Sequence, residues 1–121
     1  MQYYLELKPQ IPELFFESCA FPDASKQLLA IAKQLGIRGH FEFFSFAAQN
    51  DLAPPEYQET AIPWHDAQAG IDWLTAMMDQ IRSHPESVSD SEELLREFAQ
   101  CRGVLEQAKL RGSKWHFAMD I

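Results

Sequence analysis

The chain lacks most of the features that tie a sequence to a known chemistry. Its 121 residues include only five glycines and two cysteines, and they contain no glycine-rich phosphate loop, GxSxG nucleophile turn or dinucleotide fingerprint. The longest apolar run is far shorter than the ~20 residues of a membrane helix. No basic stretch followed by an apolar one begins the chain, so we expect no secretory signal. The sequence therefore predicts no cofactor, no membrane association and no motif-based enzyme class.

The two cysteines also lack the spacing of a metal or redox site. Cys19 and Cys101 stand far apart, and neither has a second cysteine nearby. Without an export signal we expect reduced thiols in the cytoplasm. Both are expected to pack as small apolar side chains, and Cys101 falls on the apolar stripe of a predicted helix.

Positive charge is missing from the middle of the chain. Residues 39–81 contain no lysine or arginine, and the net charge of the whole chain is −8. The acidic residues of this segment are Glu42, Asp51, Glu56, Glu59, Asp66, Asp72 and Asp79. Nucleic acids and anionic membranes bind positive charge, so neither is expected as a partner. An acidic segment fits a basic partner protein, or serves solubility alone.

Apolar patterning predicts up to five strands, at residues 3–7, 14–19, 37–46, 57–62 and 114–121. The first and last alternate cleanly between apolar and polar residues, as half-buried strands do. The last is the stronger pattern, with inward residues Trp115, Phe117, Met119 and Ile121. In residues 37–46 the alternation slips, which predicts either a strand covered on both faces or a bulge near Phe43 and Phe44. Residues 47–56 are expected to form a loop because they contain two consecutive prolines.

Three helices are expected between these strands. The first begins at a capping Asp23 and stops at Gly36. The second spans residues 67–83 with Asp66 as its cap, and the third opens at Ser89 in a capping box and ends near Gly112. Strands at both ends with helices between them predict a single α+β domain spanning residues 1–121. We expect a two-layer sandwich, in which about three helices cover one face of a small mixed or antiparallel sheet of three to five strands.

The sequence "PWHD" at residues 63–66 raises the question of a catalytic pair. Neighbouring side chains in a chain seldom point at each other, and no nucleophile is marked beside His65 and Asp66. The position of Asp66 just before a helical pattern favours a helix cap instead. We therefore assign no catalytic residue.

Our first functional hypothesis is a non-catalytic interaction module that binds a basic protein through residues 39–81. Immunity proteins that neutralise basic toxins share this size and charge, although this is an analogy of bulk properties. The candidate partner-binding residues are Glu42, Phe44, Phe46, Asp51, Glu56, Glu59 and Asp72. Phe44 and Phe46 are assigned either to the outward face of the sheet or, through a bulge, to the core. If they face outward, the same surface also allows a homodimer.

The alternative hypothesis is a metal- or ligand-binding domain, or a small enzyme, that uses the polar face of the sheet. By strand parity this face carries His40, His116 and Asp120, which are the candidate metal ligands. This hypothesis requires the strands that carry them to be neighbours.

Overall fold

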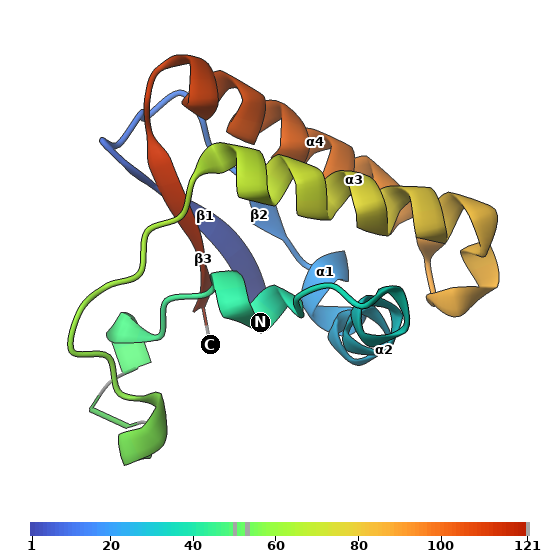
Figure 1. Cartoon of the computed structure of the whole chain (residues 1–121), viewed down its shortest axis with the longest axis horizontal. Coiled ribbons are helices and arrows are strands. Elements are labelled where there is room, and N and C mark those ends of the chain that lie inside the picture. The colour runs from blue at the N-terminus through green and yellow to red at the C-terminus, as the bar shows by residue number, and fades with distance from the viewer. Residues whose placement is uncertain (50, 53, 121) are drawn as a thin grey trace.

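The computed structural model describes residues 1–49, 51–52 and 54–120. Within them, three strands form one antiparallel sheet in the order β2-β1-β3, and helices cover one face of it (Figure 1). The elements are β1 (Gln2–Lys8), β2 (Glu17–Ser18), α1 (Ala20–Asp23), α2 (Ser25–Leu35), η1 (His40–Phe43), η2 (Ala47–Gln49), η3 (Pro55–Tyr57), α3 (Ala67–Ser83), η4 (Pro85–Ser87), α4 (Ser91–Leu110) and β3 (Lys114–Asp120). The predicted α+β fold, with helices packed on a small antiparallel sheet, is confirmed.

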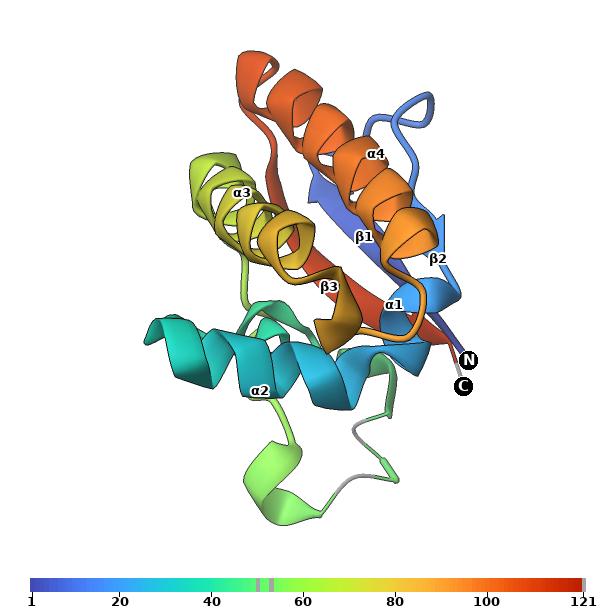
Figure 2. The ribbon, with the colours of Figure 1, turned by 90° about the vertical axis from the view of Figure 1, so that its right-hand side faces the viewer.

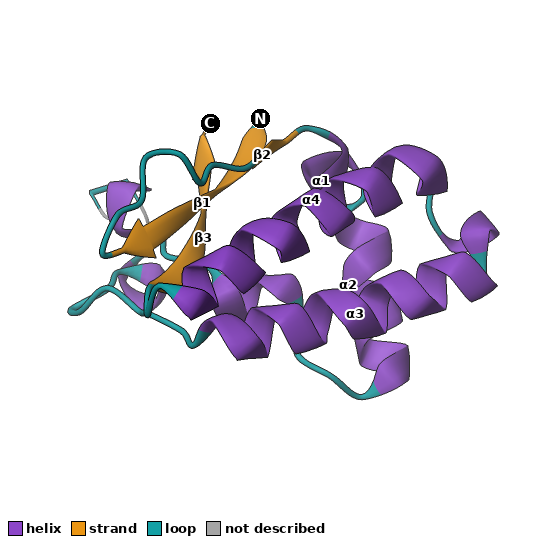
Figure 3. Cartoon of the chain, turned by 90° about the horizontal axis from the view of Figure 1, so that it is seen from above, coloured by secondary structure: helices purple, strands orange, loops and turns teal. Residues whose placement is uncertain are grey.

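The first and last strands form most of the sheet. β1 and β3 pair along their whole length, with Gln2 opposite Asp120 and Lys8 opposite Lys114. The short β2 pairs with the other side of β1, where Tyr3 lies opposite Ser18. The two ends of the chain therefore lie side by side, as Figure 3 shows from above. Tyr3, Leu5 and Leu7 of β1 face the helices, as the alternation of residues 3–7 predicts.

Helices α3 and α4 run side by side across the inner face of the sheet, and α2 crosses near their lower ends (Figure 2). The predicted stripe of α4 is buried in full, at Leu94, Phe98, Cys101, Leu105 and Ala108. The aromatic ring of Phe21 from α1 lies within this core and makes T-shaped contacts with Tyr3, Phe98 and Phe117. Such edge-to-face pairs add to the free energy of apolar burial.

The aromatic segment at residues 37–46 is not a strand, and that prediction was wrong. Residues 40–43 form the 3₁₀ helix η1, and Phe44 then makes a single parallel bridge to Phe117 of β3. Phe43 and Phe44 are both buried. Consecutive side chains of a regular strand point to opposite faces, whereas the turn at the end of η1 lets both enter the core.

Two predicted helix caps are also wrong. Asp23 ends α1 instead of capping the next helix, and α2 begins after Ala24 without a side-chain cap. At α4 the cap is Asp90, whose carboxylate accepts a hydrogen bond from the Glu93 backbone N–H at 3.2 Å. The cap predicted at Ser89 therefore lies one residue too early in the chain. The stop at Gly36 is confirmed, because this residue adopts the left-handed conformation (φ 70°).

The outward face of the sheet is less open than strand parity predicted. On β3, His116 and Ala118 point away from the helices yet are 2% and 4% exposed. They are covered because the chain following η1 packs beside and over them. Residues 57–62 contribute no strand, since the chain contacts β3 through isolated bridges at Phe44 and His65 instead. Of the residues predicted to face inward on the last strand, Ile121 lies outside the described residues.

The two cysteines have different environments. Cys101 is buried in α4, and burial raises the pKa of its thiol, whereas Cys19 is exposed, contrary to the prediction. Both thiols are free. In the described part of the chain, no helix has the length and apolar character needed to cross a membrane.

Candidate functional site

The chain between Phe44 and His65, of which residues 45–49, 51–52 and 54–64 are described, has both ends fixed to the same edge of β3, and we call it the β3-edge loop. At its start, the backbone N–H of Ser45 donates to the carbonyl of Phe117 at 2.8 Å. Just after its end, His65 and Trp115 exchange two backbone hydrogen bonds, of 2.9 and 3.1 Å. These bonds satisfy backbone groups on an edge that would otherwise be open to pairing with another chain.

Glu59 holds the β3-edge loop together from inside. Its carboxylate accepts hydrogen bonds from the Ser45 hydroxyl at 2.8 Å and from the Phe46 backbone N–H at 2.6 Å. The side-chain amide of Gln49 donates to the carbonyl of Met119 at 3.2 Å, which ties the loop to β3 a third time. Of the predicted partner-binding acids, Glu59 is therefore engaged within the fold, where it orders the loop.

Other predicted partner-binding acids face solvent on this part of the chain. Glu42 in η1 and Asp51 and Glu56 in the β3-edge loop are all exposed. Large apolar side chains are exposed in the same segment: Phe41 (37%), Leu52 (90%) and Ile62 (49%). In Figure 1 this segment runs from η1 near the centre to the lower left and back to the start of α3. Exposed apolar side chains and acids thus occur together on one part of the molecule.

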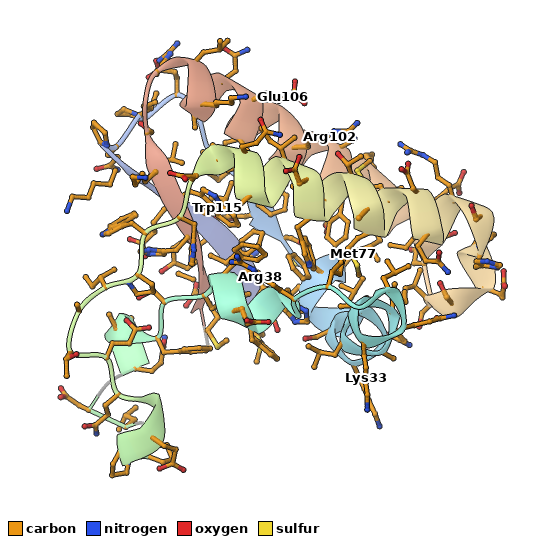
Figure 4. All side chains as sticks on the ribbon, viewed as in Figure 1. Lys33, Arg38, Met77, Arg102, Glu106 and Trp115 are labelled. Atoms are coloured by element: carbon orange, nitrogen blue, oxygen red, sulfur yellow. The ribbon has the colours of Figure 1, made fainter. Side chains whose placement is uncertain are left out.

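Asp72 lies in a different setting, on α3. Its carboxylate accepts a hydrogen bond from the Gln68 side chain at 2.7 Å. It lines an open surface pocket of about 450 Å³ together with Arg38 and Trp73. The Arg38 guanidinium, labelled in Figure 4, also lies 5.3 Å from the ring centroid of Phe43. A positive charge therefore shares the surroundings of Asp72, which distinguishes this acid from those of the β3-edge loop.

The two predicted aromatic contacts belong largely to the core. Phe44 is 3% exposed and its ring contacts Tyr3 and Phe117, with centroids 4.7 and 5.3 Å apart. Phe46 is half-buried and stacks on Phe44 at 6.0 Å. The alternative in which the chain turns both rings back towards the core matches this arrangement. Phe44 therefore offers no surface to a second copy of the chain.

The candidate metal ligands do not come together. His40 is enclosed by aromatic rings on the helix side of the sheet, with Nε2 2.6 Å from the Ser25 hydroxyl. His116 lies on the outward face, and Asp120 is exposed near the end of β3. Across the described ranges, no three or more His, Cys, Asp or Glu side chains are grouped so that they could hold a metal ion.

His40 and Ser25 have the hydrogen bond of a nucleophile and its base, but their surroundings do not match that role. Burial lowers the pKa of His40 to about 4. Its Nδ1 atom is buried and has no hydrogen-bond partner among the described residues, so nothing orients the ring as the third member of a catalytic triad would. The Tyr3 hydroxyl donates to Ser25 at 3.2 Å. The three residues form a polar link inside the core.

His116 makes two hydrogen bonds across the outward face. Its Nδ1 atom donates to the carbonyl of Pro63 at 2.9 Å, and its Nε2 atom lies 3.0 Å from Glu6 Oε1. A carbonyl oxygen only accepts, so Nδ1 must carry a proton. The contact between Nε2 and the Glu6 carboxylate is an ion pair when the ring is protonated. The ring of Trp64 packs on His116 with centroids 4.3 Å apart.

The charges of His65 and Asp66 affect each other's pKa less than their other neighbours do, and the main contacts of each side chain are with other residues. Asp66 occupies the cap position of α3, as predicted, but its side chain makes no capping hydrogen bond and forms an ion pair with Lys114 instead. The hydrogen bond from Lys114 lowers the pKa of Asp66. The His65 ring packs on Phe43 and Trp115, and burial lowers its pKa. The His65 ring and the Asp66 carboxylate therefore have separate contacts.

Sequence reasoning missed Glu6 and Trp64 as residues that face His116. Strand parity placed Glu6 on the correct face, but its position opposite His116 depends on the β1–β3 register. No signal in the sequence fixes that register. The ring of Trp64 lies against His116 on the outward face, a contact that no pattern in the sequence indicates.

Comparison with models of protein families, with curated proteins and with solved structures gives no match for this chain.

Proposed function

We propose that this protein is a non-catalytic interaction module of the cytoplasm that binds a basic partner protein through its acidic segment, residues 39–81. One observation carries the proposal: exposed acids and exposed large apolar side chains occur together between η1 and the end of the β3-edge loop. These residues are Phe41, Glu42, Asp51, Leu52, Glu56 and Ile62. Exposed apolar side chains rimmed by charge are typical of protein interfaces.

The two kinds of side chain have different tasks in such an interface. Apolar side chains such as Leu52 and Ile62 gain free energy when a partner covers them. The acids steer a basic partner towards this surface and reject acidic ones. Because residues 39–81 contain no lysine or arginine, the segment itself supplies no cation to compete with those of the partner.

The fixed ends of the β3-edge loop favour binding without a large ordering cost. Backbone hydrogen bonds hold Ser45 and His65 to β3, and Glu59 ties the loop to itself. Binding a partner through segments that are already fixed to β3 requires less loss of conformational entropy than binding through disordered ones.

The cytoplasmic part of the proposal rests on the thiols. Cys19 is exposed and Cys101 is buried, so the two sulfur atoms have no opportunity to pair within the folded chain. Free thiols persist in a reducing compartment.

Charge reversal at matched positions tests the proposal. One bait carries Glu42→Lys, Asp51→Lys and Glu56→Lys, and the control bait carries Glu86→Lys, Glu92→Lys and Glu106→Lys. Each triple changes the net charge by the same amount from −8, and all six positions are exposed. Figure 4 labels Glu106 on α4 in the upper part of the view, away from the β3-edge loop.

Both variants and the wild type are immobilised and exposed to lysate of the source cells over a series of salt concentrations. We expect a basic protein to be retained by the wild type and by the control triple, but lost from the loop triple. Retention should weaken as salt rises, since exposed charge pairs are screened beyond about 8 Å at physiological ionic strength. Equal retention by both triples would reject residues 39–81 as the binding surface.

A further inference from the structure

A second pocket, separate from the exposed acids of the loop, opens on the outward face of the sheet. It has a volume of about 390 Å³ and lies between β1, β3 and the β3-edge loop. The sheet supplies its floor through Tyr4, Glu6 and His116, and the loop supplies a wall through Ala48 and Trp64. Pockets of roughly 300–1,000 Å³ accept small molecules or single side chains.

The Glu6 carboxylate is held in position in this pocket by a buried histidine. His116 is almost fully buried and binds one carboxylate oxygen of Glu6 at 3.0 Å, while the Glu6 side chain remains half exposed. His116 is in turn fixed by the carbonyl of Pro63 at 2.9 Å. Both ring nitrogens of His116 thus contact groups of the protein itself. His116 therefore positions the Glu6 carboxylate, and it is this carboxylate that contacts a ligand.

Besides Glu6, which lines the pocket, two further carboxylates lie near Tyr4. Glu17 of β2 lies opposite Tyr4. The pKa of Tyr4 is raised by burial and further by the carboxylates of Glu6 and Asp120. Lys8 contributes a positive charge, with Nζ 5.6 Å from the ring centroid of Trp64, and this contact shows that the indole already accepts a cation.

We propose that the pocket binds a small organic cation, an ammonium or guanidinium group carried on a short apolar body. Glu6 accepts hydrogen bonds from the charged group, and Trp64 contacts the apolar part. Lys8 competes for the indole and is displaced on binding. This site goes beyond the interaction proposed for the acidic segment and does not depend on it, because the ligand is held by Glu6 and Trp64, which that interface does not use. Ile62 lines the pocket and also belongs to the interface. The cation is either a free amine or the side chain of a lysine or arginine in another protein.

The Trp64 indole N–H resonance reports directly on this pocket in an NMR titration. Three probes are added separately: phenethylamine, N-acetylarginine methylamide, and the uncharged 2-phenylethanol. We expect saturable shifts with a charged probe and none of comparable size with the alcohol. Binding of phenethylamine alone identifies a free amine as the ligand. Binding of the arginine derivative alone identifies a protein side chain, and binding of both supports the shared cationic chemistry.

Four variants locate the binding. Glu6→Gln should weaken it about tenfold, as loss of a hydrogen bond to a charged group does, whereas Glu92→Gln on α4 should leave it unchanged. Lys8→Gln should tighten it several-fold by removing the competing cation. Ala48→Phe keeps every charge and fills the pocket from an exposed position, so it should abolish binding even if Glu6→Gln disturbs the fold.

Three results would overturn the site. The first is the absence of saturable shifts with either charged probe. The second is an equal response to 2-phenylethanol, which would show that charge plays no part. The third is unchanged affinity in the folded Ala48→Phe variant, which would place the binding elsewhere.

Discussion

Gly70 is the position at which the packing of α3 against β3 and α4 can be tested by a single methyl group. A Cβ atom built on Gly70 would lie 2.7 Å from Leu105 Cδ1 and closer still to the Trp115 ring. Trp115 is fully buried, and its indole N–H donates to the Asp66 carbonyl at 2.9 Å. The ring therefore cannot move away without breaking that bond.

The expected magnitude for Gly70→Ala combines two opposing effects. Replacing glycine by alanine inside a helix stabilises by up to about 1 kcal/mol. Forcing an extra methyl group into a packed core costs about 1–3 kcal/mol, and the contact with rigid Trp115 favours the upper part of that range. We expect a net loss of about 1–2 kcal/mol in the free energy of unfolding.

Gly103 in α4 is the matched control, because it is an exposed helical glycine and a Cβ there would meet nothing within 4 Å. Gly103→Ala should therefore raise the free energy of unfolding by up to about 1 kcal/mol. Urea denaturation at equal protein concentration measures both changes. Opposite signs are the expected result. A stabilising Gly70→Ala would refute the close approach of α3 to Trp115 and Leu105.

Three further predictions concern single side chains. Because burial lowers the pKa of His40 to about 4, the unfolded chain takes up a proton between about pH 6.5 and 4 that the folded chain does not. Stability should fall by up to about 3 kcal/mol over that window, and His40→Asn should flatten the pH dependence in urea titrations. Asp90→Ala should cost ~1 kcal/mol of helix capping and Ser89→Ala almost none; equal costs in thermal unfolding would contradict the assigned cap. A colorimetric thiol reagent should modify Cys19 rapidly in the native protein and Cys101 only after denaturation, so immediate reaction of both would contradict the burial of Cys101.

The helices and the terminal strands could be predicted because each carries a period that burial enforces. The spacing of Leu94, Phe98 and Cys101 matches one face of an α-helix, and α4 buries that face. The alternation of residues 3–7 matches a half-buried strand in the same way. Helix caps were less certain, since Ser89 and Asp90 are both good capping residues and backbone geometry decides between them.

A loop at residues 47–56 could be predicted from its prolines, but the path of the β3-edge loop could not, because that path depends on single contacts instead of a repeating pattern. Its shape follows from Glu59 binding the Phe46 backbone and from bridges at Phe44 and His65. Of the candidate site, Glu42, Asp51 and Glu56 are exposed, as charged side chains usually are, and their role in partner binding stays a prediction. It could not place Glu6 beside His116, which requires the pairing of β1 with β3.

The most direct test of the proposed interface is hydrogen exchange of the backbone amides with and without the captured basic partner. Exchange reports which amides become protected when a partner covers them. The proposal predicts slowed exchange in residues 41–62 and unchanged exchange along α4. Protection of α4, with exchange in residues 41–62 left as it is in the free protein, would contradict the acidic segment as the binding surface.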